Sequence, residues 1–178
     1  ANPLPYYIAM VEAMDSEIGR LLNSMTQDEK NNTVIIFIGD NGTPQQVTQE
    51  YNPLRVKGTL YQGGINVPMI TSGKGVSRFN AIEDALINTT DLFATIANIA
   101  GIPVDKINDS QNFKELLSND NSGSRDYAYS EVGYESEKSD YTIRNKTHKY
   151  IVFEDGTEKL YNLSIDPLEL INLMHINQ

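Results

Sequence analysis

The sequence of 178 residues contains no cysteine, and this absence excludes disulfide bonds, thiolate metal sites and a cysteine nucleophile within the chain. Histidine is scarce as well, since only His148 and His175 occur. We interpret both as solvent-exposed side chains rather than catalytic groups. Acid–base catalysis that depends on several histidines is therefore not expected from this chain.

Positive charge is also in short supply. The chain has 14 lysines and arginines against 24 aspartates and glutamates, which gives a formal net charge of −10. A nucleic-acid backbone binds patches of lysine and arginine, so the composition predicts that nucleic acid is not a partner. No apolar run approaches the ~20 residues that span a bilayer, so no membrane partner is expected either. The sequence also has no leader of basic and apolar residues, and a helical pattern has already begun by Tyr6. We therefore interpret the chain as a piece of a longer protein.

One stretch, residues 33–42 (TVIIFIGDNG), combines a strand pattern with polar residues at its end. Five consecutive apolar residues, most of them β-branched, predict a strand that is buried on both faces, as in parallel α/β sheets. In open α/β sheets, ligands bind outside the carboxyl ends of the strands. We therefore expect Asp40 and Asn41 to lie where such a fold holds its ligand.

Asp40 and Asn41 together offer a carboxylate and an amide oxygen. These hard ligands suit calcium or magnesium better than zinc. The alternative is that Asp-Asn-Gly is simply a turn after a strand. Two residues cannot fill a shell of about six to eight oxygens, so a metal site here needs further ligands from elsewhere.

Two cations follow in a glycine-containing loop, at Arg55 and Lys57. A lysine in such a loop can contact an anion as a compact point charge. Both residues are equally compatible with ordinary solvated side chains, and the sequence alone leaves these alternatives open.

The remaining patterns indicate the order of elements. Apolar residues at helical spacing predict an amphipathic helix over residues 6–25, the polar residues 26–32 are read as a turn, and a second helix is expected over residues 89–100 with Gly101 as its stop signal. From residue 126 onward the chain alternates short strand-like runs with turns, which predicts an antiparallel meander. Its strands are expected at residues 127–132, 141–144, 149–153 and 159–163.

The predicted fold class is therefore α/β. Residues 1–104 are expected to form part of a mixed, mostly parallel sheet flanked by helices. Residues 105–125 are expected to be a connector, and residues 126–178 a small antiparallel subdomain with a helix. Because the first part lacks sheet neighbours, we expect exposed apolar surface or pairing with another chain.

Taken together, four segments resemble the sulfatase family within the alkaline-phosphatase-like superfamily. Their order and spacing, more than any single segment, carry the resemblance, which spans nearly the whole chain. In chain order they read YIAMVEAMDSEIGRLL followed by NTVIIFIGDNG, NPLRVKGTLYQGGINVP, TTDLFATIANIAGI, and EKLYNLSIDPLELINL. Within the second segment, Gln62 and Asn66 depart from the glutamate and arginine that the family usually carries.

The resemblance implies hydrolysis of sulfate monoesters, as in bacterial arylsulfatases, acting on a sulfated small molecule or a sulfated carbohydrate. It implies that Asp40 and Asn41 are two ligands of calcium, in preference to magnesium, and that Lys57 binds the oxygens of the sulfate ester. The nucleophile motif C/S-x-P-x-R, which yields formylglycine, is absent from this sequence. Formylglycine and the other metal ligands are therefore expected upstream, in a missing N-terminal segment of the same protein, and this chain alone is expected to be inactive. A periplasmic or secreted bacterial location is the corresponding expectation.

Two other functions remain open. The first is a phosphatase or phosphonate hydrolase of the same superfamily, although Asn41 favours a sulfatase because related phosphatases typically carry histidine there. The second is a non-catalytic interaction domain that retains the fold.

Overall fold

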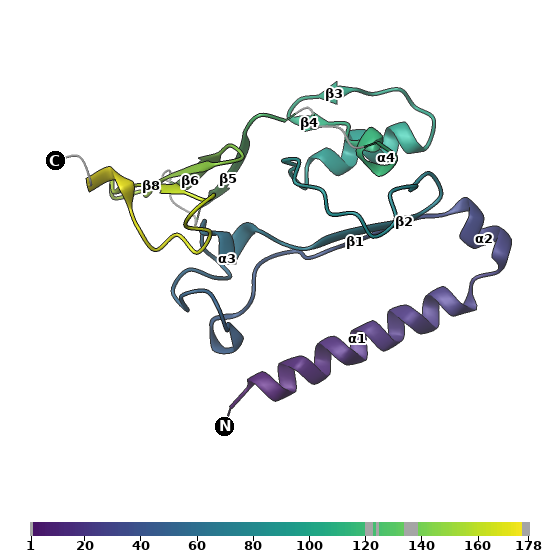
Figure 1. Ribbon diagram of the computed structural model, residues 1–178, viewed down its shortest axis with the longest axis horizontal. Coiled ribbons are helices and arrows are strands. Elements are labelled where there is room, and N and C mark those ends of the chain that lie inside the picture. The colour runs from purple at the N-terminus through teal and green to yellow at the C-terminus, as the bar shows by residue number, and fades with distance from the viewer. Residues whose placement is uncertain (1, 120–122, 124, 134–138, 176–178) are drawn as a thin grey trace.

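The computed structural model describes residues 2–119, 123, 125–133 and 139–175, and Figure 1 shows how their elements are arranged. The helices are α1 (Leu4–Ser24), α2 (Gln27–Asn32), α3 (Gln62–Ile65) and α4 (Asp91–Ile99), with 3₁₀ turns η1 (Gln45–Val47), η2 (Lys114–Leu117) and η3 (Leu173–His175). The strands are β1 (Val34–Ile38), β2 (Met69–Gly73), β3 (Lys106–Ile107), β4 (Ser110–Gln111), β5 (Ala128–Val132), β6 (Asp140–Arg144), β7 (His148–Val152) and β8 (Glu158–Asn162).

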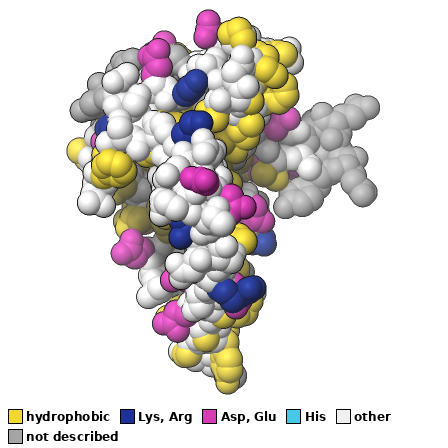
Figure 2. Space-filling model, turned by 90° about the vertical axis from the view of Figure 1, so that its right-hand side faces the viewer, with side chains coloured by type: hydrophobic (Ala, Val, Ile, Leu, Met, Phe, Trp, Pro, Cys, Tyr) yellow, Lys and Arg dark blue, Asp and Glu magenta, His cyan; other side chains and the backbone are white. Residues whose placement is uncertain are grey.

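The helix expected near the start of the chain is α1, and it is almost uncovered. It runs on the opposite side of β1 and β2 from α4 (Figure 1), and none of its residues is buried. Tyr6, Met10 and Leu21 are between 61% and 70% exposed. The expectation of exposed apolar surface is thus confirmed, and Figure 2 shows hydrophobic side chains gathered at the lower end, where α1 lies, and again near the top, over the α4 region.

No helix in the described part of the chain is long and apolar enough to cross a membrane.

Residues 26–32, which the sequence suggested were a turn, form the short helix α2. Thr26 and Glu29 build a capping box: the Thr26 hydroxyl accepts from the backbone N–H of Glu29, and the Glu29 carboxylate accepts from the backbone N–H of Thr26 at 2.7 Å. This reciprocal pair satisfies two N–H groups that a helix start otherwise leaves unbonded, so it supports a helix of only six residues.

The predicted strand over residues 34–38 is β1, and its partner is β2. The two strands pair antiparallel, with Val34 opposite Gly73 and Ile38 opposite Met69. All five residues of β1 are half-buried, which differs from the burial on both faces that the apolar run predicts. The reason is that, among the described strands, β2 is the only one that pairs with β1, so one edge of β1 is unpaired.

The four C-terminal strands confirm the predicted antiparallel meander, in the order β5-β6-β7-β8. Ile151 and Tyr161 project from the inner face of this sheet and pack against Leu60 and Tyr61, which just precede α3. The sheet therefore covers the loop that carries Lys57. This packing links the C-terminal strands to the candidate site.

Residues 105–119 do more than connect the two parts. Phe113, Leu116 and Leu117 form a second buried cluster next to α4. The Thr95 hydroxyl accepts from the backbone N–H of Phe113 at 3.0 Å, and the Ser110 hydroxyl accepts from the backbone N–H of Ala94 at 2.9 Å. These buried hydrogen bonds fix the segment on α4.

Candidate active site

The loop after β1 presents Asp40 and Asn41 at the end of the strand, and both side chains are exposed. The loop is fastened on each side of them. The backbone N–H of Gly39 donates to the carbonyl of Pro68 at 2.9 Å, and that of Gly42 donates to the carbonyl of Gly64 at 2.9 Å. Two backbone hydrogen bonds thus hold the two candidate ligands in place.

Gly42 also brings this loop unusually close to α3. A Cβ atom built on Gly42 would overlap the carbonyl oxygen of Gly63 and would come within 2.7 Å of the Cα of Gly64. Only glycine fits such a contact without moving the backbone. The glycines of the two loops therefore lock the Asp40–Asn41 turn onto the start of α3.

Lys57 lies in the same corner of the molecule. Its side chain is exposed, and its backbone N–H donates to the carbonyl of Thr43 at 3.1 Å, two residues after Asn41. Gly58 and Thr59, which follow Lys57, line a cleft of about 1240 Å³ together with Asp40 and Asn41. The structure thus brings together the backbones of the three site residues named from the sequence; the roles of their side chains stay predictions.

The donor set at this corner fits a hard cation in chemistry but not in number. One carboxylate oxygen of Asp40 accepts from the backbone N–H of Asn41 at 2.9 Å, and the other accepts no hydrogen bond from the described part of the chain. That oxygen and the Asn41 amide oxygen are available to a metal. No group of three or more histidine, cysteine, aspartate or glutamate side chains gathers among the residues that the structure describes. Asp40 and Asn41 would therefore form only part of a shell.

Two family models match the chain. The model of the sulfatase family matches residues 2–102, and the model for the C-terminal region of N-sulphoglucosamine sulphohydrolase matches residues 54–178. The chain belongs to the sulfatase family. It corresponds to a C-terminal portion of such a protein.

Curated relatives match almost the whole chain. The chain is 29% identical over 174 residues to an arylsulfatase of Clostridium perfringens, covering 95% of this chain and 35% of the relative. It is 30% identical over 197 residues to a sulfatase of Formosa agariphila, covering 96% and 35%, and 26% identical over 184 residues to mouse arylsulfatase K, covering 97% and 32%. The chain thus spans about a third of the length of the curated relatives it matches.

Solved structures share the fold. BT4656, whose structure contains its substrate D-glucosamine-2-N,6-O-disulfate, matches with a TM-score of 0.79 at 25% identity, over 95% of this chain and 35% of that one. The phosphonate monoester hydrolase of Agrobacterium radiobacter matches with a TM-score of 0.75 at 22% identity, over 94% and 36%. The α/β fold class expected from the sequence is confirmed by these matches.

In this sulfatase-family chain, the second cation of the loop has a structural task. The Arg55 guanidinium donates to the backbone carbonyl of Glu169 and lies over the ring of Tyr61, 4.8 Å from its centroid. Arg55 therefore binds the C-terminal segment. The Lys57 side chain forms no hydrogen bond with that segment among the described residues. The sequence left open whether Arg55 contacts an anion or is simply solvated. The structure shows instead that its guanidinium packs within the protein.

A buried ion pair lies behind the loop, and sequence reasoning missed it. The Lys149 ammonium is 2.8 Å from one carboxylate oxygen of Glu169, and the two side chains are 0% and 1% exposed. The other carboxylate oxygen accepts from the backbone N–H of Gln62 at 2.6 Å. Burial lowers the pKa of Lys149 from 10.5 to about 8, although the charge of Glu169 acts to raise it. The signal was present in β7, because a period of two places Lys149 on the same inner face as Ile151.

Arg144 of β6 adds a cation to the cleft wall. It is half-buried, and this burial lowers the pKa of its guanidinium. Its Nε donates to the carbonyl of Asn145 at 3.1 Å, and its other nitrogens donate to nothing within the described ranges. The charge of Glu169 acts on this pKa in the opposite direction to burial, so the buried Glu169 is already an anionic neighbour of this guanidinium.

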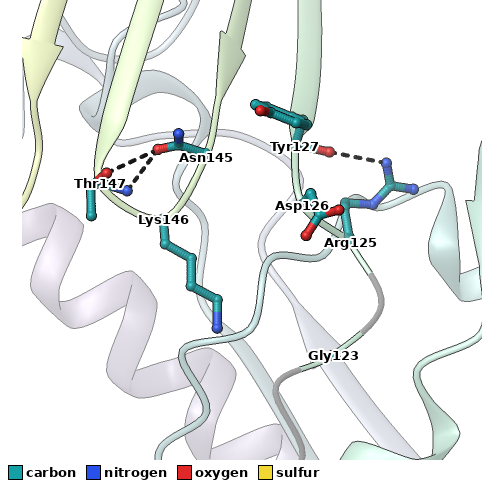
Figure 3. A pocket seen from close by; sticks show the side chains of 7 residues that line it. All are labelled: Gly123, Arg125, Asp126, Tyr127, Asn145, Lys146 and Thr147. Carbon is teal, nitrogen blue, oxygen red and sulfur yellow. Dashed lines mark hydrogen bonds between the residues drawn. The ribbon is translucent and has the colours of Figure 1, made fainter.

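A separate hollow of about 410 Å³ lies between the approach to β5 and the β6–β7 turn (Figure 3). Several of the polar groups that line it are already engaged in hydrogen bonds or ion pairs. Asn145 accepts from the backbone N–H of Thr147 at 2.9 Å, and Arg125 forms a 2.5 Å ion pair with the buried Asp91. The expected exposure of His148 is confirmed at this turn, and the side chain of His175 lies outside the described part. We assign no chemistry to this hollow.

Proposed function

We propose that this chain is part of an enzyme that hydrolyses sulfate monoesters. The observation that carries the proposal is the corner formed by Asp40, Asn41 and Lys57. One Asp40 oxygen and the Asn41 amide oxygen accept no hydrogen bond from the described residues, and both residues line the cleft. Lys57 is exposed next to Gly58 and Thr59, which line the same cleft. Membership of the sulfatase family supports the same class of reaction. Because the chain spans about a third of its relatives, the activity proposed is that of the whole protein.

Each residue has a distinct task in this proposal. Asp40 and Asn41 hold a divalent cation, calcium in preference to magnesium, through one oxygen each. Such a cation, when bound, neutralises charge that develops on the ester oxygens. The Lys57 ammonium contacts other oxygens of the same ester and stabilises the negative charge as it shifts in the transition state. The backbone is held on both sides of Asp40 and Asn41, so their oxygen atoms need no rearrangement to bind the cation.

The nucleophile in this proposal is a formylglycine from a segment outside this sequence, since the chain contains no C/S-x-P-x-R motif. The remaining metal ligands in this proposal come from the same segment, because no group of three or more acidic, histidine or cysteine side chains gathers among the described residues. The 178-residue chain by itself would then have no turnover.

We further propose a sulfated carbohydrate as the substrate class. BT4656 supports this choice because its structure holds D-glucosamine-2-N,6-O-disulfate as its substrate. Arg144 in the cleft wall adds a second cation for a substrate that carries more than one anionic group. A phosphonate or phosphate ester is the second candidate, because the phosphonate monoester hydrolase shares this fold.

The deciding experiment compares hydrolysis of an aryl sulfate, an aryl phosphate and an aryl phosphonate by the complete protein, with calcium and after chelation. We expect the sulfate to be preferred and chelation to abolish its turnover. Asp40→Ala should lose calcium and activity together, whereas Asp15→Ala on exposed α1 should lose neither. Lys57→Ala should lower turnover with calcium still bound, and Lys106→Ala serves as its control. Preference for phosphorus esters would favour the second candidate, and absence of turnover for all three would favour a non-catalytic interaction domain.

A further inference from the structure

Three C-terminal contacts meet at the loop that carries Lys57. Glu169 accepts from the backbone N–H of Gln62 at 2.6 Å, and the Lys149 ammonium lies 2.8 Å from Glu169 and 3.4 Å from the Gln62 side-chain oxygen. The backbone carbonyl of Glu169 accepts from Arg55. We call Lys149, Glu169 and their contacts to Gln62 and Arg55 the clamp.

The clamp grips both ends of a segment that belongs to the candidate site. Arg55, at one end, precedes Lys57 by two residues. Gln62, at the other end, is followed by Gly63 and Gly64. Gly42 packs against both glycines, and its backbone N–H donates to the carbonyl of Gly64 at 2.9 Å. Every step from Glu169 to the Asp40–Asn41 loop is therefore a direct contact or an adjacent residue.

The clamp is an unusual way to fasten a loop. Burying a lysine and a glutamate removes both charges from water, and an ion pair recovers that loss only when its geometry is good. Apolar side chains of similar volume would hold the same space with no such requirement. The contacts that an apolar pair could not make are those to the backbone N–H and the side-chain oxygen of Gln62. Those contacts fix where the start of α3 lies relative to β7, and not only how deeply α3 is buried.

We propose that Lys149 and Glu169 are positioning residues, which hold the segment from Arg55 to Gly64 so that Lys57 and the Asp40–Asn41 loop keep their spacing. This inference rests on the proposed function, because the spacing matters for an ester bound between Lys57 and a cation. A displacement of about 1 Å in such a site can lower a rate by about 100-fold.

The test uses two double variants of the complete protein. K149M/E169Q and K149M/E169L both remove the buried charges, but only glutamine at 169 keeps an oxygen that can accept from the N–H of Gln62. We expect both variants to fold, the leucine variant with the lower melting temperature because its Gln62 N–H has lost its acceptor. The leucine variant should show at least a tenfold lower kcat for an aryl sulfate and a weaker calcium Kd than the glutamine variant. Amide hydrogen exchange should also be faster at Gly42 and Lys57 in the leucine variant, with β5–β8 unchanged.

The readouts separate failure of the clamp from failure of the proposed function. Equal exchange, equal calcium affinity and equal kcat in the two double variants would overturn the positioning role, even if the wild-type protein is an active sulfatase. A wild-type protein that neither binds calcium nor hydrolyses sulfate would overturn the proposed function. The catalytic part of the inference would then fall with it, whatever the exchange data show.

Discussion

Removing only one member of the buried ion pair is the strongest test of the packing described above. In Lys149→Met the cation disappears while the Glu169 carboxylate stays 1% exposed, with the N–H of Gln62 as its one described hydrogen-bond donor. Loss of one partner from a buried pair typically costs about 3–5 kcal/mol, because a buried charge is left uncompensated. The charge of Arg144 still acts on Glu169, so the lower end of this range is expected. Small domains have about 5–15 kcal/mol of unfolding free energy in total, so the loss should be plain.

Urea unfolding of the 178-residue chain, followed by far-ultraviolet circular dichroism, measures this loss. The double variant K149M/E169L should recover part of the lost stability, because neither position then carries a buried charge, although the Gln62 N–H loses its acceptor. Arg20→Met is the matched control: Arg20 also forms a short ion pair, 2.6 Å from Glu17, but the two side chains are 75% and 65% exposed. Such a pair contributes little to stability. If Lys149→Met lost no more stability than the control, or if the double variant were less stable than the single one, the reasoning about the pair would be wrong.

Three further outcomes are expected. Burial lowers the pKa of Lys149 from 10.5 to about 8, so the unfolded state holds the proton more strongly, and the free energy of unfolding should rise with pH between about 8 and 10.5. The neutral amine still donates to Glu169, which Met cannot do, so urea unfolding of Lys149→Met should start from a lower stability and lack this rise. Gly42→Ala should destabilise the chain by about 1–3 kcal/mol because its Cβ overlaps the Gly63 carbonyl, whereas Gly19→Ala, in open space within α1, should stabilise it slightly; equal effects in urea unfolding would contradict the close contact. Calcium at 100 times its Kd should stabilise the complete protein by about 2.7 kcal/mol, and a thermal shift that persists in Asp40→Ala would rule that residue out as a ligand.

The sequence predicted those elements whose signals are local. The helical spacing of α1 and α4 and the alternation of β5 to β8 are patterns within a few residues, and each appears in the structure close to its expected bounds. The start of α2 was equally local, because Thr26 and Glu29 have the spacing of a capping box, but its polar composition hid a helix of six residues. Short helices held mainly by their caps carry no apolar period.

Long-range contacts could not be predicted from such patterns. The antiparallel partner of β1 begins 31 positions after β1 ends, and Glu169 contacts Gln62 across a separation of 107 positions. Glu169 lies between the half-buried Leu168 and the exposed Leu170, so no local pattern indicates that its side chain is buried. Asp40 and Asn41 were found because a strand end is a local feature, whereas the nearness of Lys57 depends on one backbone hydrogen bond to Thr43.

The unpaired edge of β1 and the incomplete donor set at Asp40 have a common explanation. β1 is apolar along its whole length, yet it has one described neighbour and remains half-buried. A further strand that paired with this edge in parallel would cover β1, and its carboxyl end would lie beside Asp40 and Asn41, because the carboxyl ends of parallel strands share one edge of a sheet. Polar side chains at that end could then complete the shell that two ligands leave open. We therefore expect the mostly parallel part of the sheet and the missing metal ligands to come from the same segment, so a single insertion beside β1 would bury the strand and assemble the site together.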